Sequence, residues 1–160
     1  MEIEADWQTI KKLFRHAFTS SFHYAISTVT ENGEPHVTPI GSLMLGAPGY
    51  GFYFEEFPSR LPRNLESNPQ VCVLAVNSSR WFWLQSLIRG EFKVPPAVRL
   101  CGKVGKAREA TDKEISLWQK KVWPVRFTKG HALMWRNMRT VRDIEFHRIE
   151  PINIGKMTGH

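Results

Sequence analysis

The sequence contains little cysteine, and what it has is arranged without the spacing of a metal site. Cys72 and Cys101 are the only two cysteines. Each lies inside a strand-like apolar segment, and neither belongs to a CxxC or Cys/His pattern. A zinc site and a disulfide framework are therefore disfavoured, and no metal ligand is expected. We expect both residues to be buried thiols.

Long apolar runs are also absent. No run approaches the roughly 18 apolar residues that a membrane-spanning helix needs. The opening stretch MEIEADW carries acidic residues where a secretory signal would carry basic ones. These absences predict a cytoplasmic protein without a membrane partner.

The chain has the size and composition of one folded domain. Its 160 residues are 42% hydrophobic and 23% charged, which is typical of globular proteins. No internal repeat, low-complexity tract or linker interrupts it. We therefore expect a single domain over residues 1–160.

The positive charge is unevenly distributed. The formal net charge is +7, but residues 1–79 carry 5 Lys and Arg against 8 Asp and Glu, whereas residues 80–160 carry 17 against 7. The basic residues of the second half are scattered rather than clustered, as on a solvated face or around an anion-binding cleft. A nucleic-acid partner is thus disfavoured, although a basic interaction module stays open as an alternative.

Apolar periodicity predicts helices at the start and late in the chain. Residues 7–18 have helical spacing, with Asp6 as the expected N-cap. Thr111 and Glu114 form a capping-box pattern that opens another helix, in which Lys120 and Lys121 are expected to be solvated. Shorter helices are expected over residues 59–67 and 131–138.

Alternating apolar residues predict six or seven strands. A hairpin turns at Glu31–Glu34, where Asn-Gly favours a type I′ turn, and Pro39 fits an edge or a bulge. Further strands are expected at 52–54, 71–76, 97–109 and 144–154, with 71–76 in a central position. The aromatic run at Trp81, Phe82 and Trp83 fits either a strand or a loop, and either packing or a lid over a ligand. Antiparallel strands without regular alternation with helices indicate a mainly β (α+β) barrel with flanking helices.

One segment between two strands has the chemistry of a phosphate site. Ser59, Arg60 and Arg63 stand close together where a helix is expected to begin. Arginine offers a planar pair of donors that match phosphate oxygens, and the free N–H groups of a helix start attract anions. A solvated surface segment is the alternative.

The order of parts from Gly33 to Val76 resembles the FMN-binding split-barrel family typified by pyridoxamine 5′-phosphate oxidase. The segments GEPHVTPIGSL, GFYFEEFPSR and NLESNPQVCVLAV carry the resemblance, and VRLCGKVGKARE continues it. It implies a six-stranded antiparallel split barrel that forms a homodimer, with FMN in a cleft at the subunit interface.

The resemblance also assigns roles to residues. It implies that the flavin ring lies against Thr38, Pro39, Ile40, Gly41 and Ser42, that Glu55 and Glu56 lie near the ribityl chain, and that Ser59 and Arg60 hold the phosphate. The family often has Lys directly after this Arg, whereas Leu61 stands here, so Arg63 is the nearest substitute. A Gln that often precedes the later barrel strand is replaced by Ala97.

The resemblance therefore implies an FMN-dependent oxidoreductase that passes a hydride or electrons between FMN and a small-molecule substrate or reductant. No side chain need act as a nucleophile, because the flavin carries the chemistry. The substrate-gripping signature of pyridoxamine 5′-phosphate oxidase itself is not evident around His147 and Arg148. A non-catalytic flavin, haem or deazaflavin carrier is the alternative.

Overall fold

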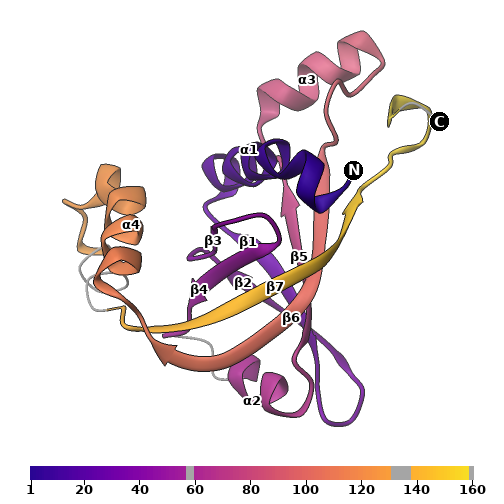
Figure 1. Cartoon of the computed structure of the whole chain (residues 1–160). Helices are drawn as coiled ribbons and strands as arrows, with labels where there is room; N and C mark the ends of the chain where they lie inside the picture. Colours follow the sequence, from indigo (N-terminus) through magenta and orange to yellow (C-terminus); the bar gives the residue numbers. More distant parts are fainter. Residues whose placement is uncertain (57–59, 131–137, 159–160) are drawn as a thin grey trace.

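The computed structural model describes residues 1–56, 60–130 and 138–158. Seven strands form one antiparallel sheet in the order β2-β1-β5-β6-β7-β4-β3, and helices flank it (Figure 1). In chain order the elements are α1 (Ile3–Ser21), β1 (Tyr24–Val29), β2 (Pro35–Ile40), β3 (Met44–Leu45), β4 (Tyr50–Phe54), α2 (Arg60–Ser67), β5 (Gln70–Val76), α3 (Arg80–Arg89), β6 (Ala97–Glu109), α4 (Asp112–Val122), η1 (Trp123–Val125), β7 (Thr140–Pro151) and η2 (Gly155–Thr158).

The predicted fold class is confirmed, with a small difference in the number of strands. The expected strands occur, and β5 lies between β1 and β6 as predicted. The sheet has seven strands rather than six because Met44–Leu45 adds a two-residue strand beside β4. Strand β2 pairs only with β1, so Pro39 lies on an edge strand, where its missing N–H breaks no ladder.

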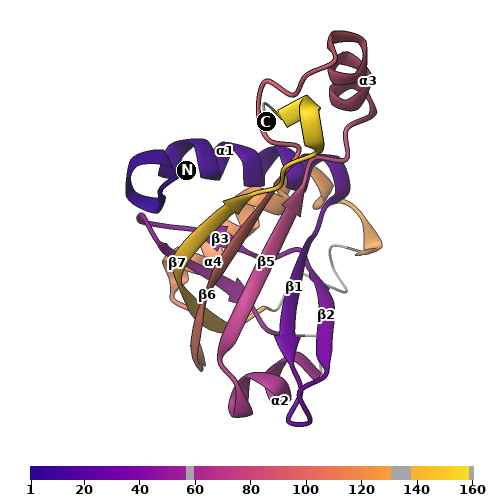
Figure 2. The same cartoon turned by 90° about the vertical axis from the view of Figure 1, so that its right-hand side faces the viewer.

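The main core lies inside the curved sheet, and α1 and α2 lie at its two ends (Figures 1 and 2). Helix α1 buries one face against the strands through Trp7, Ile10, Leu13, Phe14 and Ala17. Helix α2 contributes Leu61 and Leu65 to the same cluster. Both helices are amphipathic, so burying one face of each stabilises the barrel and leaves the other face exposed.

Helix α4 covers the outer side of β4 and β7. Trp118 and Val122 form a second core with Phe54, Met138 and Val141. The predicted capping box is present: the Thr111 side chain accepts from the Glu114 backbone N–H, and the Glu114 carboxylate accepts from the Thr111 N–H. The expected helix at 131–138 lies outside the described residues, except for Met138.

Helix α1 begins earlier than predicted. Glu2 is its N-cap, and Asp6 lies in the first turn. The Asp6 carboxylate accepts a hydrogen bond of 2.8 Å from the Glu2 backbone N–H. The acidic side chain therefore still satisfies an orphan donor at the helix start, although it does so from inside the helix.

The β1–β2 hairpin is present, but its turn is not type I′. A type I′ turn needs positive φ at both central residues, and only Gly33 has it here, with φ +81°. The Gly33 N–H donates to the Thr30 carbonyl, and the Thr30 N–H donates to the Glu34 carbonyl, both at 2.9 Å. Asn32 stays in the right-handed half of the map, and the glycine alone supplies the left-handed position.

The aromatic run is neither a strand nor a loop. Residues Arg80–Arg89 form α3, with Ser79 as N-cap and Gly90 in the left-handed conformation at the C-cap. Phe82 and Trp83 pack on Phe92, at ring-centroid distances of 5.6 and 5.2 Å. In both views α3 stands away from the sheet, beyond α1 (Figures 1 and 2).

The outer face of β2, β1, β5 and β6 is covered by no described helix (Figure 2). Register places Pro39, Ala25, Leu74 and Arg99 in one row across this face and Val37, Ser27, Cys72 and Cys101 in the next. Both cysteines are free thiols, with their sulfurs 3.4 Å apart. Cys101 is buried as predicted, whereas Cys72 is only half-buried.

None of the described helices has the length and apolar character needed to cross a membrane.

Candidate functional site

Helix α2 presents two arginines on its exposed face. Arg60 and Arg63 are exposed, and a spacing of three places them on the same side of the helix. Leu61 and Leu65 are 0% and 5% exposed on the opposite side. Neither arginine forms a salt bridge with any described residue. Two guanidinium groups are therefore free to bind an anion at the start of α2.

The rest of the predicted phosphate site is only partly described. Ser59 lies outside the described residues. Pro62 is the third residue of α2, where the missing N–H costs no intrahelical bond. Asn64 holds the helix in place, since its side-chain amide donates to the Thr28 hydroxyl at 2.9 Å in the interior.

The predicted ring contacts begin on the edge strand β2. The Thr38 hydroxyl lies 3.4 Å from Nδ1 of His36 and is half-buried. Pro39 is exposed on the outer face, and Ile40 is buried in the main core. The three residues thus alternate across the strand, so a ligand on the outer face would contact Pro39 directly.

Gly41 and Ser42 follow β2 and fasten it to the barrel. A Cβ at Gly41 would lie 3.1 Å from the Phe22 carbonyl oxygen, so the backbone of Phe22 passes close to this glycine. The Ser42 hydroxyl donates to the Phe54 carbonyl at 3.0 Å and accepts from the Phe54 N–H at 3.1 Å. Ser42 is 5% exposed, and its observed role is to join the β2–β3 connection to β4.

Glu55 is the centre of a buried ion pair. Its Oε1 accepts from Nε of Arg142 at 2.7 Å, and its Oε2 accepts from the Tyr53 hydroxyl at 2.8 Å. The side chains of Arg142 and Glu55 are only 6% and 5% exposed. Burial by itself lowers the pKa of Arg142, but the hydrogen bond and charge of Glu55 raise it overall. Glu55 therefore ties β4 to β7, and its place beside a ribityl chain stays a prediction.

Glu56 also binds the start of β7. Its Oε1 accepts from the backbone N–H of Thr140 at 2.7 Å and from that of Arg139. These bonds satisfy two backbone donors where the strand begins. Glu55 and Glu56 therefore both contact β7 or the residue before it. Glu66 of α2 joins the same cluster, since it pairs with Arg142 at 3.2 Å.

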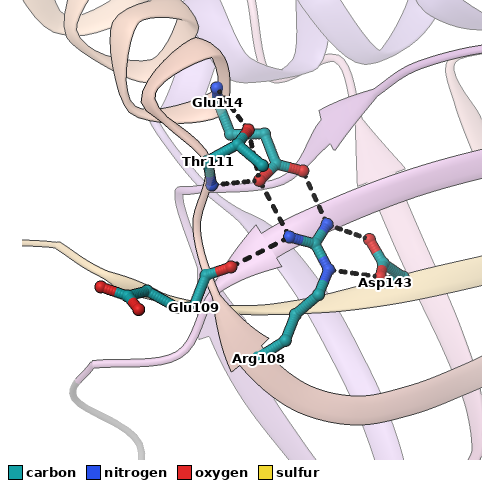
Figure 3. Close-up of polar contacts among 5 residues, drawn as sticks. All are labelled: Arg108, Glu109, Thr111, Glu114 and Asp143. Carbon is teal, nitrogen blue, oxygen red and sulfur yellow. Dashed lines mark hydrogen bonds and ion pairs between the residues drawn. The ribbon is translucent and has the colours of Figure 1, made fainter.

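A second arginine cluster, which the sequence did not predict, joins β6, β7 and α4 (Figure 3). Arg108 donates from Nη2 to Glu114 Oε1 and to Asp143 Oδ1, both at 2.6 Å. Hydrogen bonds with both carboxylates raise the pKa of Arg108. The bond from Arg108 is the main cause that lowers the pKa of Glu114 to about 2. The capping box of α4 is thereby fixed to the sheet.

The prediction that Lys121 is solvated is wrong. Its Nζ lies 4.0 Å from the centre of the Phe18 ring and donates to the Leu43 carbonyl at 2.9 Å. Burial lowers the pKa of Lys121 to about 8. The signal was present in the sequence, since Lys121 follows Trp118 by three and so lies beside the buried face of α4.

The antiparallel barrel and its arginine-bearing helix α2 are the features to compare with known proteins. The profile of the pyridoxamine 5′-phosphate oxidase family matches residues 10–152, and the chain belongs to this family. No curated protein sequence matches the chain.

Solved structures with the same fold bind different groups. An FMN-binding protein from Syntrophomonas wolfei subsp. wolfei has a TM-score of 0.61 and 12% identity over 93% of each chain. HupZ from Group A Streptococcus has a TM-score of 0.59 and 17% identity over 92% of this chain and 98% of its own. The heme storage protein HutZ from Vibrio cholerae has a TM-score of 0.50 and 16% identity over 98% and 99%. These likenesses establish the fold alone.

Proposed function

We propose that the chain is an FMN-binding flavoprotein that acts as an FMN-dependent oxidoreductase on a small-molecule substrate or reductant. The family supports flavin binding, and one observation carries the specific proposal. Arg60 and Arg63 project from the exposed face of α2 without an acidic partner among the described residues. Such a pair fits a phosphate dianion, to which each guanidinium can donate charge-assisted hydrogen bonds.

The burial of Leu61 explains how the phosphate site could work without the usual second cation. Leu61 is fully buried in the main core, so that side chain faces away from the exposed surface of α2. Arg63 lies on the same face as Arg60. We therefore assign the second cationic contact to Arg63 and the hydroxyl contact to Ser59.

The remaining predicted contacts would position the ring. Residues 38–40 form the end of the edge strand β2, whose outer side is covered by no described helix, Pro39 is exposed there, and Gly41 and Ser42 follow the strand. Bound FMN would supply hydride and electron transfer. The chain would then bind the phosphate, orient the ring along β2 and exclude water from it, without a nucleophilic side chain.

The uncovered outer face supports a homodimer with the cofactor at its interface. The outward side chains of β1 and β5 include Ala25, Ser27 and Leu74, which are small or apolar and only half-buried in the single chain. A second copy of the chain packed on this face would bury them and would enclose a ligand lying along β2. The mass of the protein in solution, measured by light scattering, should be that of two chains.

The phosphate site can be tested by comparing FMN with riboflavin, which lacks the phosphate. Arg60→Ala should weaken FMN binding by roughly 10- to 150-fold, because a hydrogen bond to a charged group contributes about 1.5–3 kcal/mol. Riboflavin binding should not change. Arg80→Ala is the matched control, since Arg80 is an exposed arginine that also begins a helix. Equal losses for both ligands, or none, would remove Arg60 from the phosphate role.

The same purified protein distinguishes the alternative cofactors. Bound FMN gives two bands in the visible and near-ultraviolet, whereas haem gives a sharp Soret band. A carrier would bind its cofactor without turnover. Stopped-flow mixing with NADH and NADPH would then show no reduction of the bound cofactor, whereas an oxidoreductase that uses either donor would show it. A basic nucleic-acid module would instead bind nucleic acid with a steep salt dependence and no chromophore.

A further inference from the structure

A cavity of about 520 Å³ lies between α1, the β2–β3 connection and the end of α4. This volume is in the range of small-molecule sites. Its apolar wall consists of Phe14, Phe18, Phe22, Tyr24, Leu43, Met44 and Leu45. The cavity is lined by α1, whereas Arg60 begins α2, and these two helices lie at opposite ends of the sheet (Figures 1 and 2). It is therefore separate from the proposed phosphate site.

The charges around this cavity have one sign. Lys11, Arg15 and Lys121 line it, and none of its described lining residues is acidic. The Lys121 ammonium carries three donors, of which one is used by the Leu43 carbonyl. Its other close neighbours are rings, with Phe18 at 4.0 Å and Tyr24 at 5.6 Å from their centres. No carboxylate forms a salt bridge with it among the described residues.

Burial explains why such an arrangement favours an anion. Removing an ammonium from water is costly unless a partner compensates, and burial accordingly lowers the pKa of Lys121 to about 8. An anionic group in the cavity would supply the missing partner. The apolar walls would at the same time disfavour a highly hydrated, multiply charged ligand.

Phe22 also lines the cavity. It is the C-cap of α1, with φ +61° and its N–H donating to the Phe18 carbonyl, so the end of the helix accounts for its left-handed conformation. Its side chain is 62% exposed and packs edge-on against Phe18 at 5.9 Å. The chain thus leaves a large exposed aromatic ring beside the cavity.

We propose that this cavity binds a monocarboxylate carried on an apolar body the size of one or two rings, with the carboxylate on Lys121 and the body among Phe14, Phe18 and Phe22. The proposal does not depend on the cofactor. It concerns a binding site on α1, α4 and Leu43–Leu45, which directly follow the proposed ring contacts Thr38–Ser42, so independence from FMN is itself measured below.

Matched probes test it by calorimetry on the full chain. 2-Naphthoate and decanoate provide the carboxylate on two different bodies, and 2-naphthamide and decanol are their uncharged counterparts. At least one carboxylate should bind at least tenfold more tightly than its uncharged counterpart. Equal affinities within both pairs, or no binding of either carboxylate at millimolar concentration, would overturn the proposal.

Substitutions of Lys121 and Lys120 test which side chain binds the carboxylate. Lys121→Met keeps the apolar stem and should abolish the preference for the carboxylate, whereas Lys120→Met, on the exposed side of the same helix, should preserve it. If Lys121→Met leaves the preference unchanged, Lys121 is not the carboxylate partner and the proposal is wrong. If the variant fails to fold, the probe pairs on the unaltered protein decide.

Two further measurements separate this proposal from the FMN site. Arg60→Ala should leave binding of the carboxylate unchanged, and saturating FMN should not compete with it. Complete competition by FMN would show that the cavity belongs to the flavin site, which would contradict the proposal of a separate ligand. Loss of FMN binding in Arg60→Ala with intact carboxylate binding would support both proposals independently.

Discussion

The arginines of the sheet and those of α2 differ in their partners rather than in their chemistry. Arg142 of β7 and Arg108 of β6 each bind two carboxylates within the chain. Arg60 and Arg63 of α2 bind none among the described residues. The two groups are close enough to be linked, because Glu66 of α2 reaches Arg142.

This difference shows how structural charges can be distinguished from binding charges. A buried guanidinium must be neutralised inside the fold, since an unpaired buried charge costs several kcal/mol. An exposed one is solvated and keeps its donors for a ligand. An arginine without an acidic partner is available to a ligand, and the position of Arg60 and Arg63 at the start of α2 is what assigns these two to the phosphate rather than Arg80 or Arg89.

The largest effect should follow from breaking the buried pair. Glu55→Ala leaves Arg142 buried without its main partner and should lower the free energy of unfolding by about 3–5 kcal/mol, measured by urea denaturation. Glu66→Ala is the control, because its side chain is 75% exposed and its removal should cost about 0–1 kcal/mol. A stable Glu55→Ala variant that loses FMN would instead make Glu55 a cofactor contact.

A smaller effect is expected for the arginines of α2, and it concerns the affinity for FMN. Arg63→Ala should leave stability almost unchanged but weaken FMN binding by about 1.5–3 kcal/mol, as for Arg60. Fluorescence titration with FMN and riboflavin measures it. Arg89→Ala, an exposed arginine in the last turn of α3, should change neither. If Arg63→Ala binds FMN normally, the phosphate site has a single arginine.

The Arg108 cluster should have an intermediate effect on stability, because Arg108 is 36% exposed. Arg108→Ala removes two ion pairs at once and should lower the free energy of unfolding by about 1–2 kcal/mol. Arg99→Ala is a useful comparison, since its single ion pair with Glu150 joins two side chains that are 43% and 36% exposed. Equal losses for both variants would mean that the network around Arg108 adds nothing.

The smallest expected effect is a loss of folding stability at low pH. Because Arg108 lowers the pKa of Glu114 to about 2, the unfolded chain binds a proton at Glu114 at higher pH than the folded one does. This contribution to stability is present above the ordinary pKa of about 4.3 and is lost as the pH falls towards 2. Denaturation at pH 6 and pH 3 should show the loss, and Arg108→Ala should reduce it. An identical pH dependence in both proteins would contradict the assignment.

Local signals predicted much of the fold. The capping box of α4, the uniformly apolar run of β5 and the alternation of β6 each lie within a few consecutive residues, so they are visible in sequence. Helix α3 was missed because Trp81, Phe82 and Trp83 are consecutive and hide the helical period. The hairpin turn was misassigned because Asn-Gly allows a type I′ turn without requiring it.

The site was harder to predict because it depends on contacts between distant residues. Glu55 and Glu56 were associated with the ribityl chain by position alone, whereas β7, more than 80 residues later, supplies the partners that occupy them. Lys121 is a different case, because its spacing from Trp118 already placed it beside the buried face of α4, although its partners Phe18 and Leu43 come from other elements. The assignments of Thr38 to Ser42, Arg60 and Arg63 to FMN stay predictions, as do the cytoplasmic location and the homodimer.

The two hydrogen bonds of the Ser42 hydroxyl have a consequence for how the barrel fluctuates. A continuous strand ladder resists opening through many bonds, whereas ahead of the short β3–β4 ladder the described hydrogen bonds from this connection to β4 are the two of this one hydroxyl. Local breathing should therefore start here, and the Phe54 amide should exchange with deuterium sooner than amides in the middle of β5.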